Sequence, residues 1–394
     1  MARARAVVIG AGVGGLATAA GLCAAGWDVT VFERAASLEP VGAALGLAPN
    51  GLRALDTFGA ADALRAMAVP QEVGIRRADG RWLMRSSTGQ MIADRFGDSI
   101  ILVPRVALID ALSARVPSGV ISVSTAVTSV EAGDAERPAR VISSAGELEA
   151  DLVVGADGIN SATREALFPG HPGLRYAGFT AWRLLTGPVS GEILMAESWG
   201  AGSVFGTMPL ADGRVYCYAA APAVAGERAA DNELAELTRR FGGWHQPIGA
   251  LLTCAEPTDV LRHDVADLAE PLATFHQGRV ALLGDAAHPM TPNLGQGGCQ
   301  ALEDAAVLAR VAEGREPDAV PEMLARYTAL RRPRANSVVR WSRRAGTTAT
   351  WTSPLAVAVR DNLARVAGKL PAGITTRGLA PIYDWQPPEA ATLR

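Results

Sequence analysis

Residues 6–34 read AVVIGAGVGGLATAAGLCAAGWDVTVFER, and this stretch decides the fold. The apolar run that opens it is typical of a buried parallel strand, and a helix rich in small residues follows before a second strand. Gly10, Gly12 and Gly15 have the GxGxxG spacing, and Glu33 ends the second strand. Such glycines allow a tight turn, close approach of a pyrophosphate and close helix–strand packing, while the acid reaches a ribose diol. The stretch therefore predicts a βαβ unit that binds a dinucleotide.

A second glycine-rich loop lies far along the chain, within residues 284–304, GDAAHPMTPNLGQGGCQALED. An apolar run typical of a buried strand precedes it, and a helical pattern starts at about Cys299. A strand, a glycine-rich loop and a helix start place backbone N–H groups where they can hold an electron-rich ligand. Two such cradles, more than 270 residues apart, predict one long ligand that is held at both ends.

Two sequence patterns alternate along the chain. One consists of apolar strands followed by helices, and the other alternates apolar and polar residues between turn signals such as Asp79-Gly80 and Thr88-Gly89. We predict an α/β fold: a Rossmann-like cofactor-binding domain with a parallel sheet, an interleaved antiparallel β-sheet domain for the substrate, and C-terminal helices. The predicted boundaries are 1–72, 100–173 and 276–346 for the first, 73–99 and 174–275 for the second, and 347–394 for the C-terminal helical segment.

Composition indicates a globular protein that does not bind nucleic acid. The 394 residues carry a net charge of −3, which provides no basic field. Four cysteines without a C-x-x-C pair suit a reducing compartment, and no histidine or cysteine spacing indicates a metal site. With no leader before the first strand and no apolar run of roughly 18 residues, we expect a cytoplasmic protein without a membrane span.

Two further patterns concern surfaces. The run Arg-Arg-Pro-Arg at 331–334 predicts a solvated helix face. Farther on, apolar residues fall at helical spacing in a segment with basic residues, which predicts an amphipathic helix. Such a helix can lie on a membrane, but docking of its apolar stripe on the protein itself is the favoured interpretation. The stripe consists of Leu355, Val359, Leu363, Val366 and Leu370.

Three motifs in order resemble those of the class A FAD-dependent aromatic hydroxylases, the single-component flavoprotein monooxygenases related to para-hydroxybenzoate hydroxylase. They are the GxGxxG stretch with its acid, the Asp157-Gly158 turn, and Gly284-Asp285 followed by PNLGQGG at 292–298. Together they span essentially the whole chain. Within the family, the chain is similar to the branch of the urate, 3-hydroxybenzoate 6- and salicylate hydroxylases, through segments 41–44, 175–182 and 295–298.

The resemblance implies that FAD occupies both cradles, with the positive end of the second helix stabilising negative charge on the reduced flavin. Arg105 opens a helix; its position alone is also compatible with a surface charge, whereas the resemblance implies contact with FAD. The other implied FAD contacts are Gly10, Gly12 and Gly15 at the pyrophosphate, Glu33 and Arg34 at the adenosine ribose, Val127 beside the adenine, Asp157 in a turn shared with NAD(P)H, Asp285 at the ribityl or pyrophosphate region, and Pro292, Gly295, Gln296, Gly297 and Gly298 around the isoalloxazine.

The resemblance also implies the activity. It is that of an FAD-dependent monooxygenase that consumes NADPH or NADH and inserts one atom of O₂ into an electron-rich aromatic or unsaturated small molecule, through a flavin C4a-hydroperoxide. The cofactor supplies this chemistry, while the protein supplies orientation and a dry cavity. Two alternatives stay open: a flavin-dependent reductase or oxidase on the same fold, without oxygen transfer, and a non-catalytic nucleotide-binding module. The choices between NADPH and NADH, hydroxylation and epoxidation, and monomer and homodimer also stay open.

The substrate region departs from the urate-hydroxylase branch. That branch carries an arginine on the substrate-domain strand and an aspartate in the proline loop, whereas this chain has Val204 and Asn293. Without that cation and that carboxylate base, urate is not the expected substrate. A larger, less polar ligand such as an indole, phenol, quinone, polyketide-like aromatic or isolated alkene fits better, although Val204 and Met208 are equally well interpreted as plain core. The pocket candidates are Trp182, Val204, Gly206, Met208, Tyr216 and Asn293.

Overall fold

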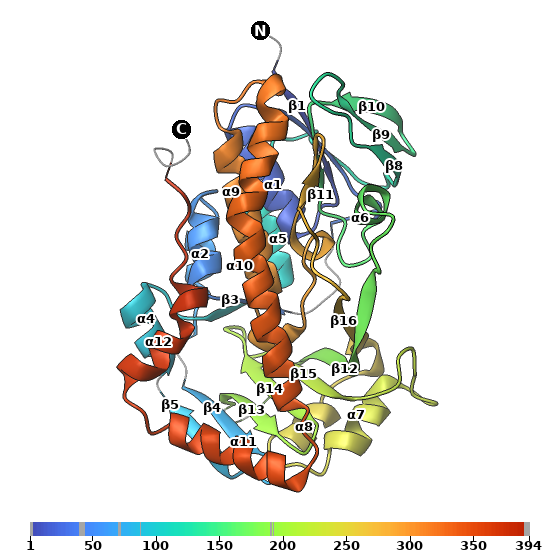
Figure 1. Ribbon diagram of the computed structural model, residues 1–394. Helices are drawn as coiled ribbons and strands as arrows, with labels where there is room; N and C mark the ends of the chain where they lie inside the picture. Colours follow the sequence, from blue (N-terminus) through green and yellow to red (C-terminus); the bar gives the residue numbers. More distant parts are fainter. Residues whose placement is uncertain are drawn as a thin grey trace.

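Two large β-sheets organise the protein, one in the upper and one in the lower part of Figure 1. The computed structural model describes residues 3–38, 44–69, 72–86, 88–189, 191 and 193–389. The long helix α10 (Val320–Ala349) runs past both sheets. This architecture confirms the predicted α/β class. Most of segment 41–44, which contributes to the family resemblance, lies outside the described residues.

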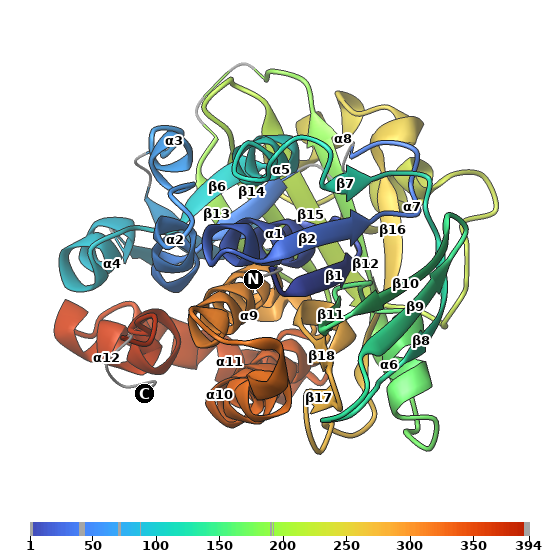
Figure 2. The same cartoon turned by 90° about the horizontal axis from the view of Figure 1, so that it is seen from above.

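The upper sheet has the strand order β17–β18–β11–β1–β2–β7 and is parallel except for the β17–β18 pair. Its central strands are buried on both faces, because helices cover one side and the three-stranded sheet β10–β9–β8 packs against the other (Figure 2). The strands are β1 (Arg5–Ile9), β2 (Asp28–Phe32), β7 (Ile121–Ser122), β8 (Val127–Glu131), β9 (Ala139–Ser143), β10 (Gly146–Ala150), β11 (Leu152–Gly155), β17 (His276–Gln277) and β18 (Val280–Leu282), and the helices of this part are α1 (Val13–Ala24), α2 (Pro49–Asp56), α3 (Asp62–Arg65), α5 (Arg105–Ser113), α6 (Ala162–Leu167) and α9 (Gly297–Ala312).

The lower sheet has the strand order β16–β12–β15–β14–β13–β4–β5, antiparallel except for the β13–β4 pair. Its β4–β5 hairpin turns at Asp79-Gly80, as predicted. Two helices cover one face, and the two-stranded ribbon β3–β6 packs on the other through Leu102. The strands are β4 (Val73–Arg77), β5 (Trp82–Ser86), β12 (Leu174–Thr186), β13 (Met195–Trp199), β14 (Val204–Pro209), β15 (Val215–Pro222) and β16 (Leu261–Leu268); the ribbon is β3 (Ala44–Leu47) and β6 (Ile101–Pro104), and the helices are α7 (Glu233–Phe241) and α8 (Ile248–Thr253).

The prediction of a turn at Thr88-Gly89 is wrong. These residues begin helix α4 (Thr88–Phe96) instead. Ile92 and Phe96, four residues apart, are both buried against the C-terminal helix α12 (Ala372–Tyr383), with the Phe96 ring edge-on to Tyr383. The i, i+4 spacing of these two apolar side chains therefore outweighs the local turn signal.

The prediction that the C-terminal apolar stripe docks on the protein is also wrong. The stripe lies on helix α11 (Pro354–Ala367) and the residues after it, and Leu355 and Leu363 are 76 % and 63 % exposed. The side chains of this helix that turn inward are those of Arg360, Asp361 and Ala364. Among the described residues, no helix combines the length and apolarity needed to cross a bilayer.

Candidate active site

The loop between β1 and α1 forms the first cradle. Gly10 has a φ of +100°, and a Cβ on it would lie 2.6 Å from the Ala156 carbonyl oxygen. A Cβ on Gly15 would lie 1.9 Å from the Gly10 carbonyl oxygen. Gly12 differs, because it is the N-cap of α1 and, in the part of the chain that the structure describes, no side chain caps the helix and no atom lies within 4 Å of where its Cβ would stand. Gly10 and Gly15 thus keep the turn tight, whereas Gly12 leaves the helix N-terminus open to a ligand.

Glu33 lies at the edge of this cradle. Its carboxylate accepts hydrogen bonds from the backbone N–H of Ala11 and from that of a residue just beyond β2, both at 2.8 Å. The Glu33 carbonyl in turn accepts from Thr125 N–H, which brings the start of β8, with half-buried Val127, to the same edge. Arg34 is exposed. The structure therefore groups Glu33, Arg34 and Val127 beside the first cradle.

Asp157 lies in the turn after β11, directly behind the first cradle. Its carboxylate accepts from the Ser161 hydroxyl at 2.5 Å and from the Thr163 N–H and hydroxyl at 3.0 and 2.9 Å, which positions the start of α6. Asp157 thus shapes the turn. The sequence analysis missed Arg164, which is 3 % exposed and donates to the Ala286 carbonyl at 3.2 Å, fastening this turn to the second cradle.

The second cradle comprises the short helices η2 (Gly284–Ala286) and η3 (Pro292–Leu294) and the start of α9. Gly295 has a φ of +61°, and no atom of the described residues lies within 4 Å of where its Cβ would stand. The two cradles adjoin because α1 packs along α9 (Figure 2), and a Cβ on Gly14 would lie 2.6 Å from Leu283 Cδ1. One ligand can therefore span both helix N-termini.

Gln296, the N-cap of α9, carries an unsatisfied donor. The side chain is 1 % exposed, and its Oε1 accepts from Asn50 Nδ2 at 2.9 Å. Its Nε2 is buried and has no acceptor among the described residues. Buried amide donors normally have a partner. A ligand with acceptor atoms at the start of α9 would supply it, and the carbonyl oxygens and ring nitrogens of an isoalloxazine fit this requirement.

Ionisable groups from several elements converge beside the second cradle. Solvent reaches the Asp285 side chain, yet the protein around it desolvates the carboxyl and raises its pKa, with His288, Arg105 and Arg183 opposing the shift. Burial and the nearby Arg183 guanidinium lower the pKa of Arg105. Burial also lowers the pKa of His263, and Arg183 lowers it further. Arg105 is therefore part of a cationic site rather than a solvated surface charge, and Arg183 and His263 are members that the sequence analysis missed.

The lower sheet divides the predicted pocket residues between its two faces. Val204, Met208 and Tyr216 share the face that carries Arg183, because they occupy matching positions in the strand register. Trp182 is adjacent to Arg183 and therefore points to the opposite face. It is 1 % exposed in the core beneath α7, where its Nε1 donates to a Glu233 carboxylate oxygen at 2.7 Å. The structure does not bring Trp182 together with the other candidates.

Two further candidates have neighbours that the sequence could not show. A Cβ on Gly206 would lie 2.1 Å from Tyr218 Cζ, so the Tyr218 ring lies across Gly206, and its hydroxyl donates to Glu197. Asn293 packs against α10, where a Cβ on Gly346 would lie 2.6 Å from Asn293 Oδ1. Tyr218 therefore covers the sheet at Gly206, and the Asn293 amide oxygen faces α10.

A buried charge cluster lies beneath the second cradle. Arg331, 1 % exposed, contacts Glu303 Oε2 at 2.5 Å and Asp304 Oδ1 at 2.6 Å. Asp304 Oδ2 also lies 2.6 Å from His288 Nε2 and accepts from Gly284 N–H at 2.8 Å. The prediction of a solvated face at 331–334 is therefore wrong for Arg331, because α9 presents two carboxylates to it from within the core. This buried charge cluster fixes α9 and η2 relative to α10.

Comparison with known proteins agrees with this geometry. The family model described as FAD binding domain matches residues 3–342. The chain is 37 % identical over 363 residues to aurachin C monooxygenase/isomerase of Stigmatella aurantiaca, covering 91 % of this chain and 93 % of that protein. It is 32 % identical over 342 residues to an FAD-dependent urate hydroxylase of Klebsiella pneumoniae, covering 85 % and 88 %. The solved structure of Klebsiella pneumoniae HpxO complexed with FAD and uric acid matches with a TM-score of 0.85 at 28 % identity, covering 95 % of each chain. The family membership predicted from the motifs is confirmed: the chain belongs to the FAD binding domain family and is a class A FAD-dependent monooxygenase.

Proposed function

We propose that this enzyme consumes NADPH or NADH and oxygenates an electron-rich aromatic molecule at the face of the lower sheet that carries Tyr216. The observation that carries the proposal is that the two cradles meet beside the cationic site that includes Arg105 and Arg183. We further propose that segments 1–72, 100–173 and 276–346 hold FAD, and that segments 73–99 and 174–275 hold the substrate. The open Gly12 and the unsatisfied Gln296 Nε2 support FAD at both cradles.

The chain's own residues would orient the substrate, while bound FAD supplies the redox chemistry with O₂. Burial raises the pKa of Tyr216, with the nearby Arg183 guanidinium opposing the shift, so the phenol stays protonated at neutral pH and can donate a hydrogen bond. Val204 and Met208 add apolar surface to the same face. These features support a substrate with a hydroxyl or other acceptor group toward Tyr216 and Arg183 and an apolar remainder.

The test is oxidation of NADPH and NADH by the purified flavoprotein, screened over phenols, indoles and quinones, with hydrogen peroxide and ¹⁸O incorporation measured together. We expect at least one aromatic compound to accelerate NAD(P)H oxidation and to gain an oxygen atom from O₂ with little peroxide. Acceleration with stoichiometric peroxide and no labelled product for any compound would contradict the proposal and favour the oxidase or reductase alternative.

Tyr216→Phe tests the proposed pocket. Loss of one hydrogen bond to the substrate is expected to raise KM about tenfold, which corresponds to about 1.4 kcal/mol. FAD content should stay unchanged. Tyr383→Phe is the matched control, because Tyr383 is also a buried tyrosine but lies at the end of α12, where it packs against Phe96 of α4. Equal KM values for the two variants would place Tyr216 outside the pocket.

The cellular location and the oligomeric state of the enzyme are separate proposals. The four cysteines, Cys23, Cys217, Cys254 and Cys299, are all free thiols, which suits the reducing cytoplasm. We propose a monomer or homodimer there. Reaction of the native protein with a thiol reagent, before and after reduction, would test the free-thiol state, and analytical ultracentrifugation would give the assembly.

A further inference from the structure

Helix α11 packs on the lower sheet through a polar face. Arg360 and Asp361 are 2 % and 1 % exposed. Arg360 donates to the Gly200 carbonyl at 3.1 Å and its guanidinium lies 5.1 Å from the centre of the Trp199 ring, while Asp361 lies 3.3 Å from Arg77. Because this ion pair is buried beneath the helix, it determines which side of α11 points outward.

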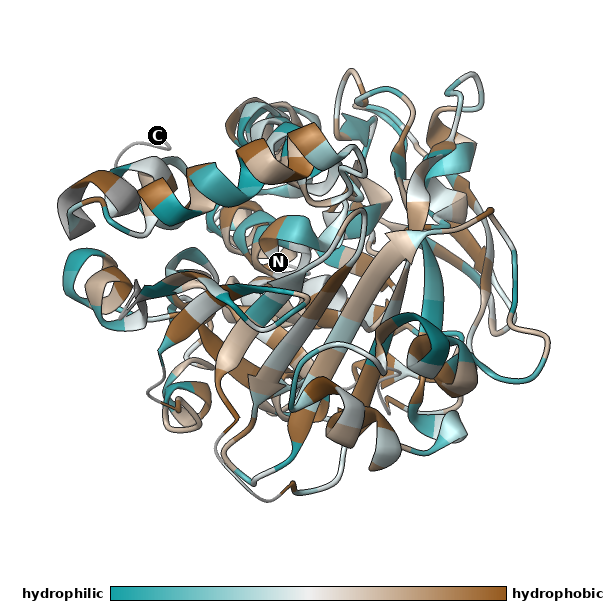
Figure 3. Cartoon of the chain, turned by 90° about the horizontal axis from the view of Figure 1, so that it is seen from below, coloured by the Kyte–Doolittle hydropathy of each residue, from teal (hydrophilic) through white to brown (hydrophobic). Residues whose placement is uncertain are grey.

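The outward side of this region is apolar. Six aliphatic side chains, here named the apolar face 355–374, recur along α11 and into the start of α12, at the end of the molecule viewed in Figure 3. Large apolar side chains that gather on a protein surface mark an interaction site. The six residues and their exposures are Leu355 76 %, Val359 46 %, Leu363 63 %, Val366 58 %, Leu370 41 % and Ile374 52 %.

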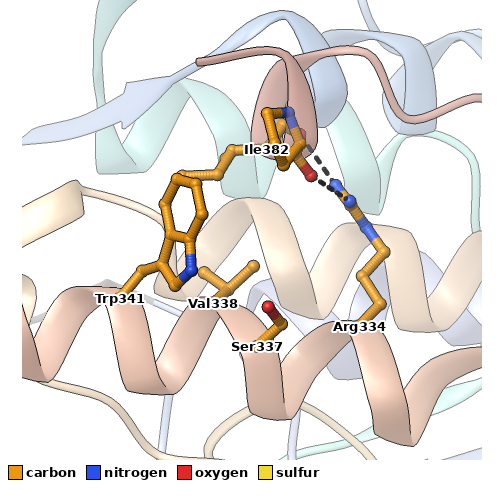
Figure 4. A pocket seen from close by; sticks show the side chains of 6 residues that line it. Arg334, Ser337, Val338, Trp341 and Ile382 are labelled. Atoms are coloured by element: carbon orange, nitrogen blue, oxygen red, sulfur yellow. Dashed lines mark hydrogen bonds between the residues drawn. The ribbon is translucent and has the colours of Figure 1, made fainter. Parts of the chain in front are cut away.

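The apolar face 355–374 belongs to a segment that is anchored to the rest of the protein. At the far end of α12, the Arg334 guanidinium donates to the carbonyl oxygens of Pro381 and Ile382 at 2.8 and 2.7 Å (Figure 4). Arg334 also pairs with Glu303 of the buried charge cluster at 2.6 Å. Anchored at α12 and through the buried Arg360–Asp361 pair, the segment presents its apolar side chains as a preformed surface.

The charges around this face have one sign. Lys369 and Arg377 are exposed, and Arg365 is half-exposed at its flank. The only acidic residue between 351 and 379 is Asp361, which is buried. Two copies of the chain that met through this face would bring six cations together without a carboxylate from the same segment, which is unfavourable. A surface that combines exposed Leu and Val with Lys and Arg complements an anionic lipid bilayer.

We propose that the apolar face 355–374 binds the surface of anionic membranes, as a peripheral contact in which the aliphatic side chains enter the headgroup boundary and the basic residues meet anionic headgroups. This site is distinct from the proposed active site, because Tyr216 is 7 % exposed within the protein whereas the side chains of the apolar face 355–374 point to solvent. It does not require a membrane span, and it would place the enzyme beside a lipid phase while leaving its FAD cradles within the protein.

The test is co-sedimentation of the FAD-loaded enzyme with vesicles of phosphatidylcholine alone and with vesicles that contain phosphatidylglycerol. We expect binding to the anionic vesicles, weakened by salt, and at least about tenfold weaker binding of the double variant Leu363→Gln, Val366→Gln. Arg365→Gln, Lys369→Gln should lose the preference for anionic lipid. Val224→Gln is the matched control, because Val224 is 71 % exposed but lies outside the apolar face 355–374.

Three results would overturn the proposal. The wild-type enzyme could fail to bind anionic vesicles, or the double variant and Val224→Gln could bind equally well. Sedimentation velocity without lipid could instead show a dimer that Leu363→Gln, Val366→Gln dissociates, which would make a second copy the occupant. Unchanged FAD content and thermal unfolding of each variant would show that the fold is intact, so that a loss of binding reports on the surface.

Discussion

Replacing Gly12 with valine is expected to abolish stable FAD binding while leaving the chain folded. Gly12 has φ and ψ of −71° and −176°, an extended conformation that valine adopts readily, and none of the described residues has an atom within 4 Å of where its Cβ would stand. Only the cost of valine at a helix N-cap, about 1 kcal/mol, should fall on the fold. The added side chain would occupy the space at the N-terminus of α1 that a pyrophosphate needs.

We expect the affinity of Gly12→Val for FAD to fall at least about 100-fold, or about 2.8 kcal/mol. Titration of the apo-protein with FAD measures this, and circular dichroism with thermal unfolding of the apo-protein shows whether the fold survives. Gly170→Val is the matched control, because Gly170 is an exposed loop glycine whose Cβ would also lie more than 4 Å from every atom of the described residues. Stoichiometric FAD in purified Gly12→Val would show that the first cradle does not hold the pyrophosphate.

The positions of the cradles could be predicted from the sequence because the backbone there requires glycine. At Gly10 the positive φ, and at Gly15 the 1.9 Å approach to a carbonyl oxygen, exclude a side chain regardless of the rest of the fold. Because such constraints are local, a short stretch of sequence is enough to predict the strand, the glycine-rich turn and the helix that follows. The family assignment followed from these local signals and is confirmed by the match to the FAD binding domain model.

The polar residues of the site were harder to predict, because whether a side chain reaches the site depends on which face of its strand or helix is buried. In β12 the alternation of side chains places Trp182 in the core and Arg183 beside Tyr216, and the sequence pattern alone favoured the aromatic residue. In α11 the inward face is set by the Arg360–Asp361 pair and its long-range partners, so amphipathicity did not reveal the orientation. Tertiary partners of this kind lie far away in sequence and leave no local pattern.

Replacing Arg331 with methionine is expected to cost about 3–5 kcal/mol of unfolding free energy, because it removes the buried cation that two buried carboxylates share. The guanidinium contacts both Glu303 and Asp304, and it also donates to the Gln300 side chain at 2.9 Å. The same cluster reaches the second cradle, since Asn50 Nδ2 donates both to Glu303 Oε1 at 2.7 Å and to Gln296 at 2.9 Å. Weaker FAD binding should therefore accompany the loss of stability.

The pH dependence of this loss has a defined sign. Burial alone would raise the pKa of Asp304, but His288 and Arg331 outweigh it and lower the pKa from 3.8 to about 2. The stabilisation that comes from the lowered pKa is complete above 3.8 and is lost as pH falls toward 2, so the difference between wild type and Arg331→Met should be largest at neutral pH and narrow in acid. Urea unfolding at several pH values measures this difference in unfolding free energy. Arg332→Met is the control, because within the described residues Arg332 makes a single hydrogen bond, to the Leu272 carbonyl, and its replacement should cost about 1 kcal/mol. A similar cost for both variants, or a difference independent of pH, would mean that the buried charge cluster does not stabilise the fold and that the position of α9 depends on apolar packing alone.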